Sequence, residues 1–453
     1  MAAVEHLDLD EQIARWRAHA ERRQAIGTDV DELEDHLRGL VEELEASGLS
    51  PDEAFLVAVR RMGALDDVSR EFAREHAERL WKQLVVMQDD GPPGRGRRGL
   101  GLVLALAVGA GLAVKIPSLF DVDGDTLALF YLPNLSLLVF PFLAAWFAWS
   151  RSMPARRVWV QLVLPFAVAA LAANLFPLTQ DSASLVLMTI HLPIALWFVV
   201  GLAYTGGEWR SGARRMDFIR FTGEWFVYYV LIALGGAALV GLTGLGFTAI
   251  GVDPFPVLGA WVVPCGAAGA VLVAAWLVEA KQNVIENIAP VLTRVFTPLT
   301  TIALLVFLVT VAVARPGVDV ERELLILGDL MLVLVLGLIL YALSARSPDT
   351  PPGLFDRLQL LLVALALVVD ALMLVAMAGR IAEFGASPNK VAALGLNIVL
   401  LVNLARAGWL GLGFVRGRRP FGAVERWQTD YLPVIAVWVT LVALVLPPVF
   451  GWA

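Results

Sequence analysis

The sequence has almost none of the residues that build disulfides or metal centres. Among its 453 residues there is one cysteine, Cys265, and there are five histidines. A single cysteine permits no disulfide within the chain, and the histidines show no spacing typical of a zinc site. We therefore expect neither redox nor metal chemistry, and no cofactor.

The motifs of several common enzyme classes are missing as well. The chain has no GxxxxGK[ST] phosphate loop, no GxSxG nucleophile turn and no HExxH pair, which are the minimum parts of ATPases, hydrolases and zinc proteases. We expect a protein that is not an enzyme. The first residues, MAAVEHLDLDEQIARW, are acidic and lack the basic region followed by an apolar run of a secretory signal. We therefore expect this end of the chain in the cytoplasm.

Hydrophobic residues are abundant and unevenly distributed. They make up 58% of the chain, and the mean hydropathy is +0.71, whereas soluble domains are about 45–50% apolar. Residues 1–90 contain 11 Lys/Arg and 22 Asp/Glu, a net charge of −11, and residues 91–453 contain 24 and 20, a net charge of +4. The uneven charge predicts an acidic soluble domain (1–88), a Gly/Pro-rich linker (89–98) and a membrane domain (99–453). The acidic domain would be repelled by phosphates, so we expect no nucleic-acid binding.

The soluble part shows the periodicity of amphipathic helices. Leu33, Leu37, Leu40, Val41 and Leu44 recur three or four residues apart among acidic residues, which predicts one helix ending near Gly48.

A second helix follows in GLSPDEAFLVAVRRMG. Ser50 is suited to the N-cap, Pro51 to the first turn, Glu53 to a capping box and Gly63 to the helix stop. With a helix around Trp16 and a further apolar stripe from Val68 to Leu84, we expect a bundle of about four short helices.

The order of these patterns, a Trp followed by ELEDHL, GLSPDEAF, RRMG and REF, resembles the permease prefix domain over residues 8–85. This module is a short cytoplasmic domain ahead of bacterial multi-pass membrane proteins, so the resemblance implies a bacterial inner-membrane location. The membrane part, with FTGEWFVYYVL, LVEAKQN and RWQTDYLPV, resembles an uncharacterised family of permease-like proteins. This second resemblance transfers no catalytic or transport residue.

The membrane part contains eleven apolar runs of about twenty residues, enough to cross a hydrocarbon layer about 30 Å thick as helices. We therefore predict an all-α protein in contact with the lipid bilayer, in which a polytopic helical bundle follows the small soluble one. The predicted spans are 99–117, 126–149, 157–177, 183–204, 225–250, 256–280, 295–314, 323–345, 357–379, 391–414 and 431–451.

The charges of the loops predict an orientation. Alternate loops contain eighteen Lys/Arg, whereas the opposite set contains five and includes the acidic loop DVDGD at residues 121–125. Because basic loops stay in the cytoplasm, we expect a cytoplasmic N-terminus and an extracytoplasmic C-terminus.

Polar residues within spans are candidates for function, because they are costly at membrane depth. Asp370 lies mid-way along the ninth span, and Asn403 and Arg406 lie in the tenth at a similar estimated depth. We expect these three side chains to meet, either as a structural ion pair with a snorkelling arginine or as a substrate or proton site. Asp329, nearer the end of the eighth span, is expected to reach the outer interface.

Polar residues also occur in the fourth predicted span and around the end of the sixth. His191 lies mid-span near Pro193 and is either a satisfied interior histidine or part of a proton relay. The helix continuing from the sixth span carries Glu279, Asn283, Glu286 and Asn287 close together. These four residues form a candidate docking surface for the soluble domain, a candidate inner gate, or a solvated helix end.

Two functions remain open. The first is a permease-like membrane protein that is regulated by its cytoplasmic domain, with transport of a solute or ion. The alternative is a signalling or scaffold protein in which the spans hold the soluble domain at the membrane, where it binds a partner protein. The acidic soluble domain suits a basic partner, including the arginine-rich loops of its own membrane domain.

Overall fold

The computed structural model describes residues 9–22, 30–47, 49–62, 95–120, 123–280, 288–313, 322–346 and 350–452. The chain divides into two compact units, Met1–Arg98 and Gly99–Ala453, here called the front unit and the membrane unit.

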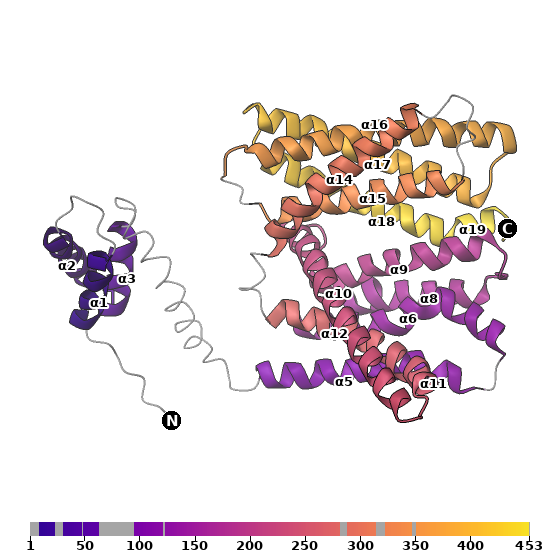
Figure 1. Ribbon diagram of the computed structural model, residues 1–453, viewed down its shortest axis with the longest axis horizontal. Helices are drawn as coiled ribbons and strands as arrows, with labels where there is room; N and C mark the ends of the chain where they lie inside the picture. The colour runs from indigo at the N-terminus through magenta and orange to yellow at the C-terminus, as the bar shows by residue number, and fades with distance from the viewer. Residues whose placement is uncertain are drawn as a thin grey trace. The chain divides into compact units, whose positions relative to one another are not determined.

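The front unit contains three described helices (Figure 1): α1 (Leu9–Arg22), α2 (Val30–Ala46) and α3 (Pro51–Met62). Their apolar faces form one small core around Trp16 of α1, Leu37 of α2 and Phe55 of α3, because residues three and four apart share a helix face. The apolar stripe predicted for a fourth helix lies outside the described residues.

The start of α3 forms the acidic half of the predicted capping box. Glu53 accepts hydrogen bonds from the backbone N–H of Ser50 at 3.1 Å and from its hydroxyl at 2.8 Å. These bonds lower the pKa of the Glu53 carboxyl, with the backbone bond as the largest cause. The hydrogen bonds thereby define the first turn of α3.

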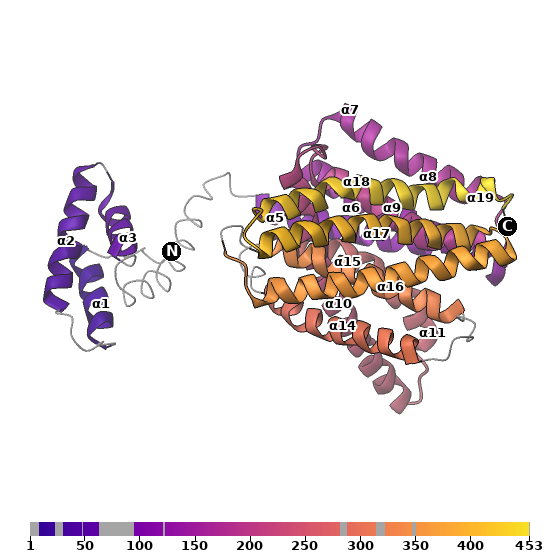
Figure 2. The same ribbon diagram turned by 90° about the horizontal axis from the view of Figure 1, so that it is seen from above.

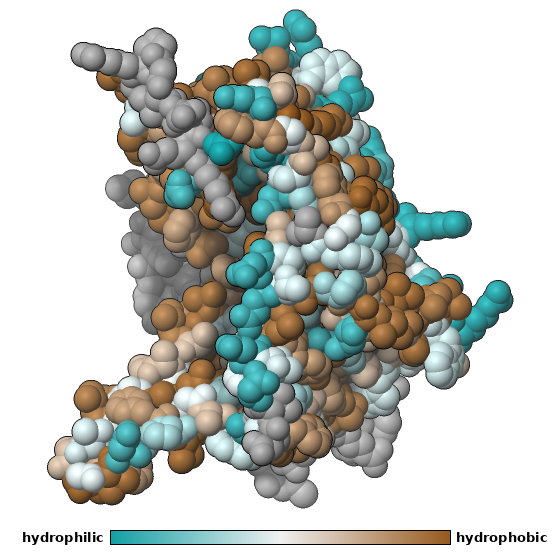
Figure 3. Space-filling view, turned by 90° about the vertical axis from the view of Figure 1, so that its right-hand side faces the viewer, coloured by the Kyte–Doolittle hydropathy of each residue, from teal (hydrophilic) through white to brown (hydrophobic). Residues whose placement is uncertain are grey.

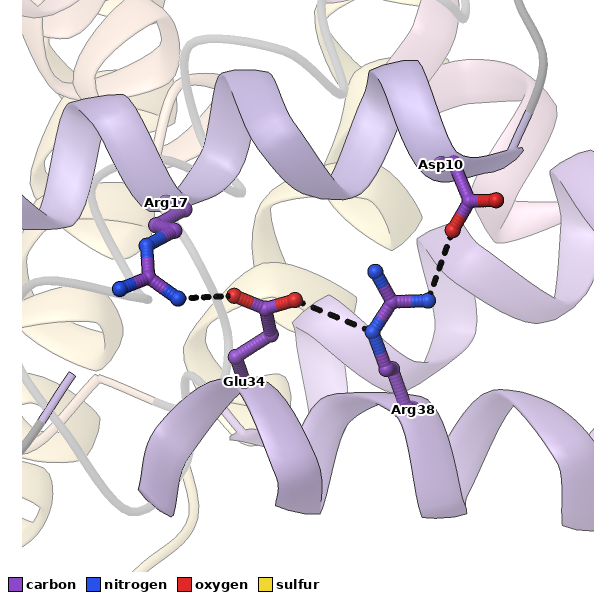
Figure 4. Close-up of polar contacts among 4 residues, drawn as sticks. All are labelled: Asp10, Arg17, Glu34 and Arg38. Carbon is purple, nitrogen blue, oxygen red and sulfur yellow. Dashed lines mark hydrogen bonds and ion pairs between the residues drawn. The ribbon is translucent and has the colours of Figure 1, made fainter. Parts of the chain in front are cut away.

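A chain of charges joins α1 and α2 on the surface of the front unit (Figure 4). Arg17 donates to one Glu34 oxygen at 2.7 Å, and Arg38 donates to the other at 3.0 Å and to Asp10 at 2.8 Å. The hydrogen bond from Arg17, followed by the contacts with Arg38, lowers the pKa of Glu34. Four alternating charges thus align the two helices.

The membrane unit contains eleven described helical segments that are long and apolar enough to cross a membrane, which confirms the predicted number and class. They are Gly99–Leu119, Gly124–Ser150, Ala155–Leu175, Ala183–Tyr204, Gly212–Ala249, Phe255–Ala280, Leu292–Val311, Glu323–Ser344, Leu354–Phe384, Pro388–Val415 and Gly422–Leu444. This is the architecture of a multi-pass integral membrane protein.

These spans belong to helices whose bounds differ somewhat from the apolar runs. The single-element spans are α5 (Arg95–Lys115, followed by η1, Ile116–Leu119), α6 (Gly124–Ser150), α9 (Ala183–Tyr204), α10 (Gly212–Ala249), α14 (Ile288–Val313), α15 (Arg322–Ser344), α16 (Leu354–Phe384), α17 (Pro388–Val415) and α18 (Gly422–Leu444), with α19 (Leu446–Val449) after the last. The third span joins α7 (Ala155–Val158), the π-helical η2 (Trp159–Val163) and α8 (Leu164–Leu175), and the sixth joins α11 (Phe255–Val257), the π-helical η3 (Leu258–Val262) and α12 (Val263–Ala280).

Two boundaries correct the sequence prediction. Residues 95–98, expected in the linker, form the first turn of α5. The fifth span, predicted to begin at residue 225, belongs to a helix that begins at Gly212 and has 38 residues. Ser211 caps its start by accepting from the N–H of Arg214, and the polar residues that follow continue the helix because helical structure does not require apolar residues.

Within the membrane unit the spans form two bundles, with α5–α12 below and α14–α18 above in Figure 1. The first core includes Phe147, Phe221 and Leu272, and the second includes Leu304, Val335 and Leu404. The bundles meet where α9 lies along α18 and where α10 packs against α15 and α18. Figure 2 shows α7 and α8 along one outer edge of the unit.

The far half of α10 extends away from both bundles. In Figure 3 the corner where α10 meets α11 projects at the lower left with a mostly brown or pale surface. Leu239, Leu242 and Leu245 are each about two-thirds exposed there. Such a surface is stable in lipid, where an exposed leucine costs nothing.

Candidate functional site

Three polar side chains from neighbouring helices meet inside the second bundle. Asp329 lies on α15, Asp370 on α16 and Asn397 on α17, and these three helices pack against one another. Counted along each helix from the same end of the bundle, Asp329 lies about 10 Å deep, Asp370 about 21 Å and Asn397 about 14 Å. We call this group the carboxylate site.

The three side chains lie close together, and two of them are fully buried. The carboxylates of Asp329 and Asp370 are near enough for their charges to repel, and the Asn397 amide lies beside Asp329. Asp370 and Asn397 are both 0% exposed, and Asp329 is half-buried.

Close packing holds α15 against α16 next to the site. A methyl group added at Gly328 would lie 2.6 Å from Sδ of Met373, one turn after Asp370. The glycine beside Asp329 therefore allows the two helices to approach each other.

The carboxylate site lacks the partners that buried polar groups normally have. Neither oxygen of Asp370 has a hydrogen-bond partner among the described residues, and the Asn397 amide makes no hydrogen bond of ordinary geometry. No described lysine, arginine or histidine pairs with Asp370. Unsatisfied buried polar groups are rare and costly, so this arrangement needs an explanation.

The predicted contact of Asp370 with Asn403 and Arg406 is wrong. Asn403 instead exchanges two hydrogen bonds of 3.1 Å with Gln428 of α18. The guanidinium of Arg406, which is exposed, lies 4.3 Å from the ring centre of Trp409 and 5.9 Å from that of Trp427. The two α17 residues therefore face α18 and the lipid boundary, away from Asp370.

His191 is satisfied within its own helix. Its ring Nδ1 donates to the carbonyl oxygen of Leu187 at 2.9 Å, one turn earlier on α9, and the side chain is half-buried. This contact corresponds to the interpretation of His191 as a satisfied interior histidine, and among the described residues no hydrogen bond joins His191 to the carboxylate site.

Glu279, predicted as part of a docking surface or gate, is already paired. An Nη of Arg151 donates to both of its oxygens, at 2.9 and 3.0 Å, and Nε of Arg151 donates to the carbonyl of Tyr204 at 3.2 Å. The pair joins α6, α9 and α12. Asn283, Glu286 and Asn287 lie outside the described residues.

Similar pairs occur at the same arginine-rich end of the membrane unit. Arg346 contacts Asp356 at 2.8 Å and lies over the rings of Phe414 and Phe421. Arg215 of α10 pairs with Asp430 of α18. Each of these three described pairs gives a carboxylate a charged partner, whereas both oxygens of the buried Asp370 lack one.

The chemistry of the site follows from its composition. Two carboxylates in apolar surroundings do not both remain ionised without a compensating positive charge. The pair either shares a proton or holds a small cation, and the amide oxygen of Asn397 supplies a further hard ligand. Among the described residues, no cluster of three or more His, Cys, Asp and Glu side chains is arranged to hold a metal ion.

Sequence reasoning found Asp370 but missed its neighbours. Asp329 lies near the end of its span, which favours an interfacial position, and Asn397 has no charge that would mark it as costly at membrane depth. Helix rise places Asp329 and Asn397 within about 4 Å of each other in depth but Asp370 about 7 Å deeper than Asn397, so residue counting does not bring the three together. No family model, curated protein or solved structure matches the chain.

Proposed function

We propose that this protein is a permease-like membrane protein in which the carboxylate site binds a proton or a monovalent cation during transport. The observation that carries the proposal is the Asp370 carboxylate, which is fully buried between membrane helices and has no described partner. An ionisable group in this position is expensive to keep, and such groups mark ion and proton pathways in membrane proteins.

The arrangement of the two bundles supports the same role. The carboxylate site lies on α15, α16 and α17 of the second bundle, and α17 also packs against α9 of the first. Binding or release of a proton or cation at the carboxylate site therefore changes the charge close to the boundary between two separately packed cores. Small shifts between packed elements are the usual basis of gating.

Binding is tested with the purified full chain in detergent. We expect thermal stability to rise with NaCl relative to choline chloride, or to depend on pH, because a ligand that binds the folded state stabilises it. Asp370→Asn should remove this dependence. The matched control is Glu383→Gln, which removes an exposed carboxylate from the same helix and should retain it. An identical ligand response in Asp370→Asn and the unmodified chain would refute the site.

Transport is tested separately in proteoliposomes. With an imposed membrane potential, we expect entry of protons, read by an internal pH dye, or of radioactive sodium, and Asp370→Asn should reduce the rate at least tenfold. Ligand-dependent stability without any flux would leave the site in place but exclude transport of these ions.

A second function is favoured by the front unit. Its described helices have a core of their own and a four-residue charge network, as expected for a module that binds a partner or regulates the spans. We propose a cytoplasmic, regulatory position for it. Deletion of residues 1–88 should leave a folded membrane unit with an altered flux or ion response. An unchanged response would favour the scaffold function, in which the front unit acts only on another protein.

A further inference from the structure

An apolar groove lies on the outer edge of the first bundle, far along the chain from the carboxylate site. Its volume is about 420 Å³, within the range of about 300–1,000 Å³ typical of ligand pockets. It lies between α6 and the third span, and its walls are almost entirely apolar, with several alanines, among them Ala145 and Ala167.

Two irregular helices create the groove. α6 contains Pro141, which lines it, and the third span passes through the π-helical turn η2 before Pro165 near the start of α8. Prolines and π-turns bend helices and prevent parallel packing, and the alanines leave the resulting space unfilled.

The length of the groove matches one leaflet of a bilayer. Its lining runs from Leu137 to Ala148 on α6 and from Val158 to Ala170 on the third span, about 16 and 18 Å by helix rise. Half of a hydrocarbon layer is about 15 Å thick. A lipid acyl chain that enters at one end would therefore reach the other end at the bilayer midplane.

One end of the groove lies at the level of lipid headgroups. Trp149, at the end of α6, is 53% exposed, and Trp159, beside Val158, is 66% exposed, as expected for indoles at a membrane interface. Arg156 and Arg157 precede Val158 on α7, and both are exposed.

The two arginines supply a positive charge at this mouth. Arg156 makes no hydrogen bond or ion pair with the described residues, and Arg157 uses one nitrogen, which donates to the carbonyl of Gly206 at 3.2 Å. The side chain of Arg157 lies against Gly207, whose φ is +81°. A methyl group added at Gly207 would lie 2.8 Å from Cδ of Arg157. The glycine turn thus fixes Arg157 while its other donors remain available.

We propose that this groove is a binding site for one anionic phospholipid, with an acyl chain between α6 and α8 and the phosphate at Arg156 and Arg157. The apolar lining, the leaflet-length groove and the paired cations at its interfacial end match the two parts of such a lipid. The proposal does not depend on transport or on the carboxylate site.

Native mass spectrometry of the full chain tests the headgroup contact, with phosphatidylglycerol and phosphatidylcholine of identical acyl chains as probes. One phosphatidylglycerol should be retained more tightly than phosphatidylcholine. Replacing both arginines, Arg156→Gln with Arg157→Gln, should weaken phosphatidylglycerol binding roughly 30-fold, since each basic residue near an anionic surface contributes roughly fivefold. Arg416→Gln with Arg418→Gln, which removes two exposed arginines at the end of α17, should change it less than twofold.

The acyl contact is tested with a photoreactive acyl chain on phosphatidylglycerol, which should label peptides from 137–148 or 158–170 of the unmodified chain. Ala145→Leu with Ala167→Leu should fill the groove and abolish this labelling, while thermal stability without lipid confirms folding. Labelling confined to other helices would overturn the proposal, as would equal losses of affinity in the two double-arginine variants.

Discussion

The charged residues at the arginine-rich end of the membrane unit have ion-pair partners, whereas the charged residue in the interior of the second bundle has none among the described residues. At the arginine-rich end, Arg151 with Glu279 and Arg346 with Asp356 form short, paired contacts that join different helices. Inside the second bundle, Asp370 is more deeply buried than any of these residues and has no described partner. The first kind of position stabilises the fold, whereas the second weakens it, so the second is better explained by binding than by structure.

The largest expected change in the free energy of unfolding comes from breaking a paired contact. Glu279→Gln should lower the free energy of unfolding by about 2 kcal/mol, because it leaves the partly buried Arg151 guanidinium without its charged acceptor. Thermal unfolding in detergent measures the change. Glu208→Gln is the matched control, since Glu208 and Arg214 are exposed and 3.8 Å apart, and should have almost no effect. Equal effects would mean that burial does not distinguish these pairs.

The next effect should have the opposite sign. Asp370→Val should raise the free energy of unfolding by about 1 kcal/mol, because it removes an unpartnered polar group from an apolar interior. Asn403→Val, at an equally buried residue that is hydrogen-bonded to Gln428, should lower it by a similar amount. The same unfolding measurement, made in choline chloride so that no sodium is bound, applies to both, and a loss of stability in Asp370→Val would show that the carboxylate has a structural partner.

The smallest effect concerns the exposed charge network of the front unit. The pKa of Glu34 is lowered in the folded chain from its ordinary 4.5, chiefly by the hydrogen bond from Arg17. Its stabilising contribution is therefore complete above pH 4.5 and is lost as the pH falls through the lowered value. Each such exposed pair contributes on the order of 0.5 kcal/mol.

Hydrogen exchange in α1 and α2 of the full chain should consequently increase, relative to the intrinsic exchange rate, as the pH falls below 4.5. Glu34→Gln should flatten this dependence, and 1 M salt should reduce it for the unmodified chain. If the variant retained the full pH dependence, another acidic group would be responsible.

The sequence was sufficient for the number of spans and for the identity of Asp370, but not for its neighbours. Counting residues estimates how deep a side chain lies, and by that measure Asn403 was a reasonable partner. Asn397 and Asn403 are six residues apart, and at about 100° per residue they point about 120° away from each other. Only packing decides which of the two faces α16, because α17 is apolar on nearly every side.

Local patterns were more informative in the front unit. Ser50 and Glu53 mark a helix start directly. The stripe around Leu37 belongs to an amphipathic helix whose solvent-facing side is polar, so the buried side can be identified from the sequence. In the membrane unit both the lipid-facing and the buried sides are apolar, which removes that contrast. Asp329 lies only seven residues after the start of α15, which favours an interfacial position when depth is judged by residue counting alone.

Hydrogen bonds near the start of α10 hold that part of the helix, and this has a mechanical consequence. Near its start, Arg220 donates to the carbonyl of Ser344 at 3.1 and 2.7 Å, and Trp225 donates to that of Val271 at 3.0 Å, so one end of the rod is attached to both bundles. From Trp225 to its end at Ala249, α10 extends about 36 Å, and a tilt of about 5° at Trp225 would displace the tip by about 3 Å. α10 thus acts as a lever, and a dye at its tip would report small rotations between the bundles.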